Sequence, residues 1–173
     1  MFRNILVGYD GSPHAERALD EAIDLAVASR ARLTILTSVP RPQPWVFTGL
    51  TAGPAMALTA ELSNESEQIL RRARERVPDE VPLTTVLERC PAVDALRRRI
   101  REGDHDLVVV GSRGRGPLCS ALLGSVSRAL QRHSHVPVLV VHGEPALTGR
   151  TTQAPPSVPR VSSPALKPFA GPR

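Results

Sequence analysis

The chain has 173 residues, with 22 Lys and Arg against 17 Asp and Glu, so its formal net charge is +5. This length suits one domain with a substantial core, while two cysteines exclude a disulfide scaffold and an aromatic content of 3% requires an aliphatic core. No apolar run approaches the ~20 residues of a membrane helix, and residues 2–10 lack a signal-peptide pattern, so we expect a cytoplasmic protein without membrane contact.

The first predicted element is a strand over residues 4–9, whose sequence Asn-Ile-Leu-Val-Gly-Tyr is typical of a strand buried on both faces of a parallel sheet. Ser12 as N-cap and Pro13 as first helical residue then begin a helix, with alanine and leucine at helical spacing as far as Ala26. Residues 33–39 are predicted as the second strand. This β-α-β order predicts parallel strands.

Residues 40–54 are predicted as a loop, since they contain four prolines and the only tryptophan, Trp45. A long helix is expected over 55–77, ended by Pro78, and an edge strand over 83–88. Pro91 is predicted to begin a third helix, which Gly103 closes at the C′ position. The inward-facing positions predicted for the long helix are Leu58, Leu62, Ile69, Ala73 and Val77.

A fourth strand over 107–110, a helix carrying Val126 and Leu130, and a fifth strand over 137–141 complete the predicted elements. Five strands alternating with four helices indicate an α/β fold: one domain with a doubly wound parallel sheet and helices on both faces. We place this domain at residues 1–143. Residues 144–173 hold seven prolines without apolar periodicity, and we predict a disordered tail in which a partner-binding motif stays open.

The most informative motif follows the fourth strand. Gly111 and Gly114 come directly after an apolar run, and nine residues then separate Gly114 from Gly124 and Ser125 at the start of a helix. Glycines let the backbone approach a ligand, and a helix start offers free N–H groups and the positive end of its dipole. Neither GxxxxGK[ST] nor GxGxxG is present, so the standard P-loop and dinucleotide motifs are excluded.

This G-x2-G-x9-G-S pattern resembles the nucleotide-binding signature of the universal stress protein family. The opening Ile5-Leu-Val-Gly-Tyr-Asp-Gly-Ser and the ending His133-Ser-His-Val-Pro-Val-Leu-Val-Val are similar to the same family, and the resemblance covers roughly residues 1–142. It implies the strand order 3-2-1-4-5. With that order, a ligand crevice is expected where strands 1 and 4 end, at Asp10 and Gly111.

The resemblance also implies roles for individual residues. Asp10 is expected to bind the ribose or the base, Val39 to contact adenine, and the main chain of Gly8 and Tyr9 to meet the base edge. The phosphate cradle is expected to comprise Val110, Gly111, Ser112, Arg113, Gly114, Gly124, Ser125, Val126 and Ser127. Arg115 is a further basic residue near the triphosphate. Ordinary turns at Asp10-Gly11 and at the later glycines are the alternative explanation of these motifs.

From the resemblance we expect a cytoplasmic stress-response or regulatory protein that binds ATP, with Mg2+ on the triphosphate, and forms a homodimer through residues 136–141. A slow ATPase or nucleotidyl-transfer enzyme is one alternative, although no Walker lysine or paired carboxylate supports catalysis. We assign no catalytic and no metal-ligating residues.

A second alternative is a non-catalytic adaptor for a protein partner or nucleic acid. The arginines are dispersed along the chain, with four on each of two candidate helices, over 71–76 and 97–101, and without interleaved aromatic residues. We therefore interpret them as solvated helix faces and do not expect nucleic-acid binding. Cys90, next to Pro91, either narrows the crevice or is inert, and Cys119 is either a structural or a redox-sensing thiol.

Overall fold

The computed structural model describes residues 1–39, 52–115 and 123–142, which all fall within one unit spanning Met1–Gly143. The predictions for Trp45 and its loop, for Cys119 and for the 144–173 tail lie outside the described residues.

The sheet is parallel throughout and has the strand order β3-β2-β1-β4-β5, as predicted. The central strand aligns Ile5 with Leu33 on one side and with Leu107 on the other. Each strand lies within one residue of its predicted bounds, because continuous apolar runs mark strands that are covered on both faces. The strands are β1 (Asn4–Gly8), β2 (Arg32–Ser38), β3 (Leu83–Glu88), β4 (Leu107–Gly111) and β5 (Val138–Val141).

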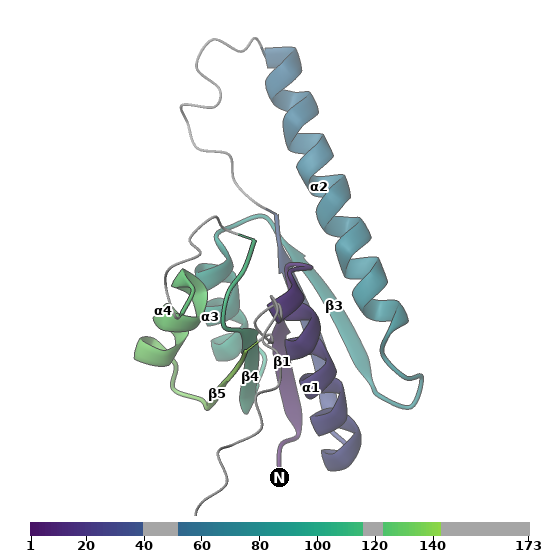
Figure 1. The fold of residues 1–173 in the computed structure, drawn as a ribbon, viewed down its shortest axis with the longest axis vertical. Helices are drawn as coiled ribbons and strands as arrows, with labels where there is room; N and C mark the ends of the chain where they lie inside the picture. The colour runs from purple at the N-terminus through teal and green to yellow at the C-terminus, as the bar shows by residue number, and fades with distance from the viewer. Residues whose placement is uncertain (40–51, 116–122, 143–173) are drawn as a thin grey trace, which may run out of the picture. The chain divides into compact units, whose positions relative to one another are not determined.

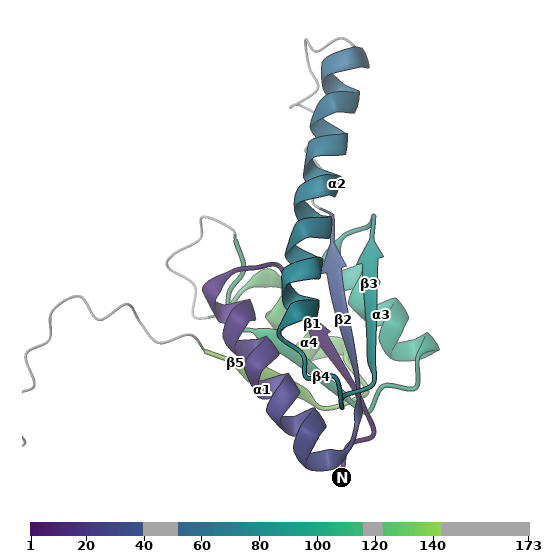
Figure 2. The ribbon, with the colours of Figure 1, turned by 90° about the vertical axis from the view of Figure 1, so that its right-hand side faces the viewer.

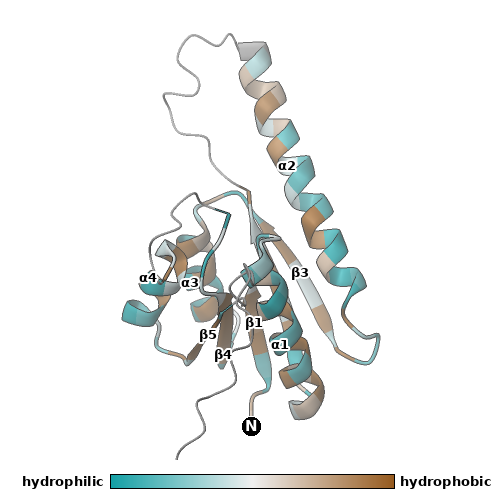
Figure 3. Cartoon of the chain, in the orientation of Figure 1, coloured by the Kyte–Doolittle hydropathy of each residue, from teal (hydrophilic) through white to brown (hydrophobic). Residues whose placement is uncertain are grey.

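In the described ranges, four helices cover the two faces of the sheet, with α1 (Pro13–Ser29) and α2 (Ala52–Glu75) on one face and α3 (Ala92–Glu102) and α4 (Ser125–His133) on the other (Figure 1). Alternate residues of β1 serve the two cores: Ile5 and Val7 pack with α1 and α2, and Leu6 packs with α3 and α4. Figure 3 shows the apolar residues gathered on the central strands.

The start of α1 confirms its predicted cap, because the Ser12 hydroxyl accepts the N–H of Ala15 at 3.3 Å and Pro13 is the first helical residue. The bounds predicted for α2 were wrong by two to three residues, since the helix runs from Ala52 to Glu75. Pro54 falls inside the first turn, where a helix needs no N–H donor. The N-terminal half of α2 extends past the ends of the strands (Figure 2).

The end of α3 corrects a second prediction. Gly103 is the C-cap with φ −109°, and the left-handed residue is the next one, Asp104, with φ 50°. The glycine is needed for space instead, because a Cβ at Gly103 would stand 2.6 Å from Nε2 of the buried His105 ring.

Candidate functional site

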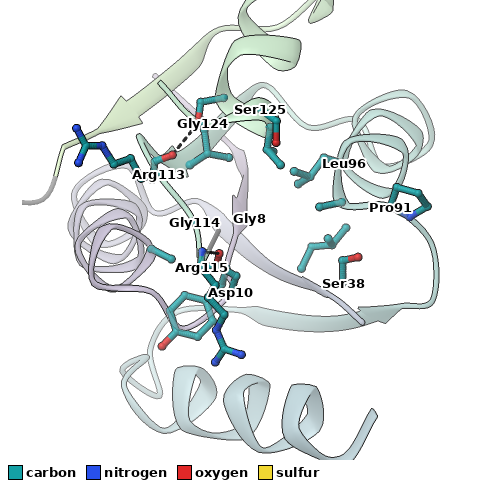
Figure 4. Close-up of a pocket in the computed structure, with 18 of the residues that line it drawn as sticks. Gly8, Asp10, Ser38, Pro91, Leu96, Arg113, Gly114, Arg115, Gly124 and Ser125 are labelled. Atoms are coloured by element: carbon teal, nitrogen blue, oxygen red, sulfur yellow. Dashed lines mark hydrogen bonds between the residues drawn. The ribbon is translucent and has the colours of Figure 1, made fainter. Parts of the chain in front are cut away.

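A cavity of about 460 Å³ opens at the carboxyl ends of β1, β2 and β4, between the N-termini of α3 and α4. The predicted crevice at Asp10 and Gly111 is part of it (Figure 4). Two loops approach each other there although they are about a hundred residues apart in the chain, because β1 and β4 are neighbours in the sheet. An open parallel sheet leaves room for a ligand at such a switch point.

Twelve of the thirteen candidate residues line this cavity: Gly8, Tyr9, Asp10, Val39, Val110, Gly111, Arg113, Gly114, Gly124, Ser125, Val126 and Ser127. Ser112 does not. Its side chain is buried and lies 3.2 Å from Nδ1 of His14, measured from Oγ. Its main chain holds the site together, since its N–H donates to Val141 and its carbonyl accepts the N–H of Gly124, both at 2.7 Å.

The cavity has an apolar half that sequence reasoning missed. Leu36 comes from β2, Ala92 and Leu96 come from α3, and Pro91 is the N-cap of that helix; Val39 and Val110 line the cavity with them. Gly8 permits this arrangement, because a Cβ there would stand 3.1 Å from Val110 Cγ1 and 3.2 Å from Leu96 Cδ1. This end of the cavity therefore has an apolar lining. Only the pairing of α3 with this sheet face reveals it.

The other half of the cavity is formed by the N-terminus of α4. Gly124 is its N-cap, and the first helical hydrogen bond runs from the N–H of Arg128 to the carbonyl of Gly124 at 3.1 Å. The N–H groups of Ser125, Val126 and Ser127 therefore have no helical acceptor, and no acidic residue stands in this first turn. Together with the helix dipole, these three donors make a site for an anion.

Two groups expected to serve the cradle are already bonded within the protein. The N–H of Gly124 donates to Ser112, and the Ser127 hydroxyl donates to the carbonyl of Gly111 at 2.7 Å. These bonds fasten α4 to the end of β4. At the start of α4, the donors that line the cavity are thus the N–H groups of the first turn, with the exposed Ser125 hydroxyl beside them.

Asp10 connects the two loops at the cavity mouth. Its Oδ1 accepts the N–H of Ser12 at 3.0 Å, and its Oδ2 accepts the N–H of Arg115 at 3.1 Å. Each carboxylate oxygen has a second lone pair that a ligand hydroxyl could use. Among the described residues that line the cavity, Asp10 is the only carboxylate.

The two motif glycines leave space for neighbouring groups. A Cβ at Gly111 would stand 2.7 Å from the carbonyl carbon of His14, so this glycine lets α1 approach β4. A Cβ at Gly114 would stand 2.6 Å from Asp10 Oδ2. Neither has a positive φ, which among the described glycines only Gly11 shows, at 73°.

The side chains of Tyr9 and Arg113 are directed away from the cavity. Tyr9 is 4% exposed and its hydroxyl contacts Glu16 of α1, so that burial raises the pKa of the phenol. Figure 4 shows the Arg113 guanidinium outside the ring of lining residues. Burial and this nearby guanidinium lower the pKa of His14.

Other features bear on the alternatives. Within the described residues, no group of three or more His, Cys, Asp and Glu side chains could hold a metal ion.

Cys90 packs at the edge of the core under α3 and is absent from the cavity lining, while its carbonyl accepts the Ser38 hydroxyl. In the described part of the chain, no helix is long and apolar enough to span a bilayer.

The fold and cavity define a doubly wound α/β protein with a cavity at the N-terminus of α4, and similarity to known proteins identifies its family. The sequence matches the model of the universal stress protein family over residues 1–142. Universal stress protein YxiE from Bacillus subtilis is 33% identical over 148 residues, which cover 82% of this chain and 99% of that protein. The chain therefore belongs to the universal stress protein family.

Other relatives differ in length or are known as structures. Universal stress protein Rv2623 from Mycobacterium tuberculosis is 32% identical over 155 residues, which are 87% of this chain but 51% of that protein, so the chain spans about half of it. A universal stress protein solved in complex with cAMP is 31% identical, with a TM-score of 0.58 and coverage of 82% and 98% of the two chains. Universal stress protein UspA from Lactobacillus plantarum, at 22% identity, TM-score 0.61 and coverage of 80% and 97%, supports the fold alone.

Proposed function

We propose that this chain is a cytoplasmic regulatory protein of the stress response that binds ATP in the cavity between β1 and β4. The observation that carries the proposal is the row of three N–H groups at the start of α4, which face a cavity that is apolar at its other end. A nucleotide has the same two halves, a flat base and an anionic chain. The relative solved with cAMP, at 31% identity, adds support for a nucleotide ligand.

Each part of ATP has a matching part of the cavity. The apolar end of the cavity, lined by Leu36, Leu96 and Val39, would hold the base, and Asp10 would accept a ribose hydroxyl. The first turn of α4 would bind the phosphates. Mg2+ would neutralise part of the charge of the triphosphate. It would be held by the phosphate oxygens and by Asp10, the carboxylate that lines the cavity.

We also propose that the chain forms a homodimer through β5. This strand is at the edge of the sheet, and its Leu139 is 37% exposed although it is a large apolar residue. An apolar edge strand is suited to pairing with a second copy.

The proposed ATP site can be tested at a single N–H group. Ser125 is the first helical residue of α4, a position at which proline is tolerated. Ser125→Pro removes both the N–H and the hydroxyl, whereas the matched control Ser125→Ala removes only the hydroxyl. Calorimetric titration with ATP should show affinity lowered about 10-fold or more in Ser125→Pro, as expected for a lost hydrogen bond to a charged group, and a smaller loss in Ser125→Ala.

Equal ATP affinities of Ser125→Pro and the wild type would contradict the proposed site. Native mass spectrometry of the purified protein, followed by titration with ATP, ADP, AMP and cAMP, would identify the preferred nucleotide. Turnover above about 1 per second would favour an enzyme over a binding protein, since typical kcat values begin near that rate.

A further inference from the structure

Arg115 contacts two parts of the molecule, the cavity mouth through its main chain and α2 through its side chain. Its main chain lines the cavity, where its N–H donates to Asp10 Oδ2. Its guanidinium reaches α2 instead, where Nη1 lies 2.8 Å from Oε1 of Glu65. Figure 4 shows this side chain extending from the cavity mouth toward the neighbouring helix. The residue therefore connects the proposed phosphate site to α2.

The ion pair between Arg115 and Glu65 is exposed, and a stronger anion can replace Glu65 as the partner of Arg115. The two side chains are 42% and 52% exposed, and ion pairs of such exposure contribute little to stability. A phosphate group carries more charge than one carboxylate and accepts two parallel N–H bonds from a guanidinium. Gly11 leaves room for the guanidinium beside it, because Arg115 Nη2 lies 3.0 Å from the position that a Cβ of residue 11 would take.

We propose that Arg115 selects nucleotides by the length of their phosphate chain, and that Glu65 sets how strongly it does so. This inference rests on the proposed ATP site. Without ligand the guanidinium pairs with Glu65. A chain of two or three phosphates has anionic oxygens beyond those held by α4, and these take the guanidinium from Glu65, whereas a monophosphate held by α4 has no second phosphate to offer it. Glu65 is thus a competitor of the terminal phosphate, and it lowers the affinity for ATP.

The same exchange couples the cavity to α2. Glu61 and Glu65 are four residues apart on this helix and border the same shallow hollow of its surface. Loss of the Arg115 partner leaves two like charges at this spacing, which weakens a helix. Coupling between two sites is reciprocal. A change on α2 that weakens the ion pair between Arg115 and Glu65 must therefore raise the affinity for the polyphosphate by the same factor.

The experiment is a titration of adenosine, AMP, ADP and ATP into four proteins: wild type, Arg115→Gln, Glu65→Gln and the double variant. In Arg115→Gln the affinity for ATP should fall about tenfold, while the affinities for AMP and adenosine change less than twofold. In Glu65→Gln the affinity for ATP should rise about 1.4- to 5-fold, which corresponds to the usual strength of an exposed ion pair. In the Arg115→Gln background, Glu65→Gln should have no effect.

The matched control is Glu67→Gln, which makes the same change of net charge at an exposed position of the same helix. If Glu67→Gln raises the ATP affinity as much as Glu65→Gln does, the effect is general electrostatics and the inference is wrong. A loss of affinity in Arg115→Gln that is equal for AMP and ATP would also overturn it. Failure of the proposed function is distinguishable, because the wild type would then bind none of the four ligands.

Discussion

Substitution of Gly114 by alanine tests the geometry of the cavity mouth most directly. The added Cβ would stand 2.6 Å from Asp10 Oδ2, closer than two such atoms can approach. The backbone at Gly114 has no positive φ, so alanine meets no conformational obstacle there. All of the cost must therefore come from moving the Asp10 carboxylate.

The size of that cost follows from what Asp10 holds. Moving its carboxylate breaks the bond from the N–H of Arg115 at 3.1 Å and disturbs the one from Ser12 at 3.0 Å. Hydrogen bonds to charged groups contribute about 1.5–3 kcal/mol, and because this one is exposed we expect a loss of about 1–2 kcal/mol in the free energy of unfolding. The affinity for ATP should fall about tenfold as the loop shifts, which corresponds to ~1.4 kcal/mol.

A double-mutant cycle separates this clash from other effects. Urea unfolding is measured for the wild type, Gly114→Ala, Asp10→Ala and the double variant, and ATP is titrated into each by calorimetry. In the Asp10→Ala background the new methyl group meets no carboxylate, so Gly114→Ala should cost less there, with a coupling of about 1 kcal/mol. Additive effects of the two substitutions on stability would show that the close contact is not the cause.

Three more outcomes are expected. In Gly111→Ala the new Cβ meets the main chain of His14 at 2.7 Å, which cannot rotate away, so urea unfolding should show a loss of about 1–3 kcal/mol; wild-type stability would contradict the close approach of α1. In Ser127→Ala the loss of the 2.7 Å bond to Gly111 should lower the unfolding free energy by about 1 kcal/mol, and an unchanged urea midpoint would count against that bond. Burial lowers the pKa of His105 below 6.5, so the unfolded chain binds a proton more readily than the folded one. The associated stability is complete above about pH 6.5 and is lost as the pH falls through the lowered value, by up to ~1.4 kcal/mol per pH unit. His105→Gln should reduce the dependence of the unfolding free energy on pH between pH 6.5 and 5. If the wild type and the variant show the same dependence, His105 is not its source.

Short sequence patterns are enough to predict most helices and strands of this fold. Apolar runs such as 107–110 mark strands covered on both faces, and Ser12-Pro13 marks the start of α1, because burial and capping act over a few neighbouring residues. The motif glycines and Ser125 likewise marked one end of the cavity. Where an element ended without such a signal, as at the first turn of α2, the prediction missed by up to three residues.

The other features of the cavity and its mouth depend on packing between segments that are far apart in the sequence. The apolar half of the cavity needs Leu36 and Leu96 to line the same space, and the reason for a glycine at 111 lies in the main chain of α1, about a hundred residues away. The pairing of Arg115 with Glu65 depends in the same way on where α2 crosses the sheet. A local pattern shows which face of an element is buried, but it does not show which side chain will lie opposite. That is fixed only when helices and strands from different parts of the chain pack against each other.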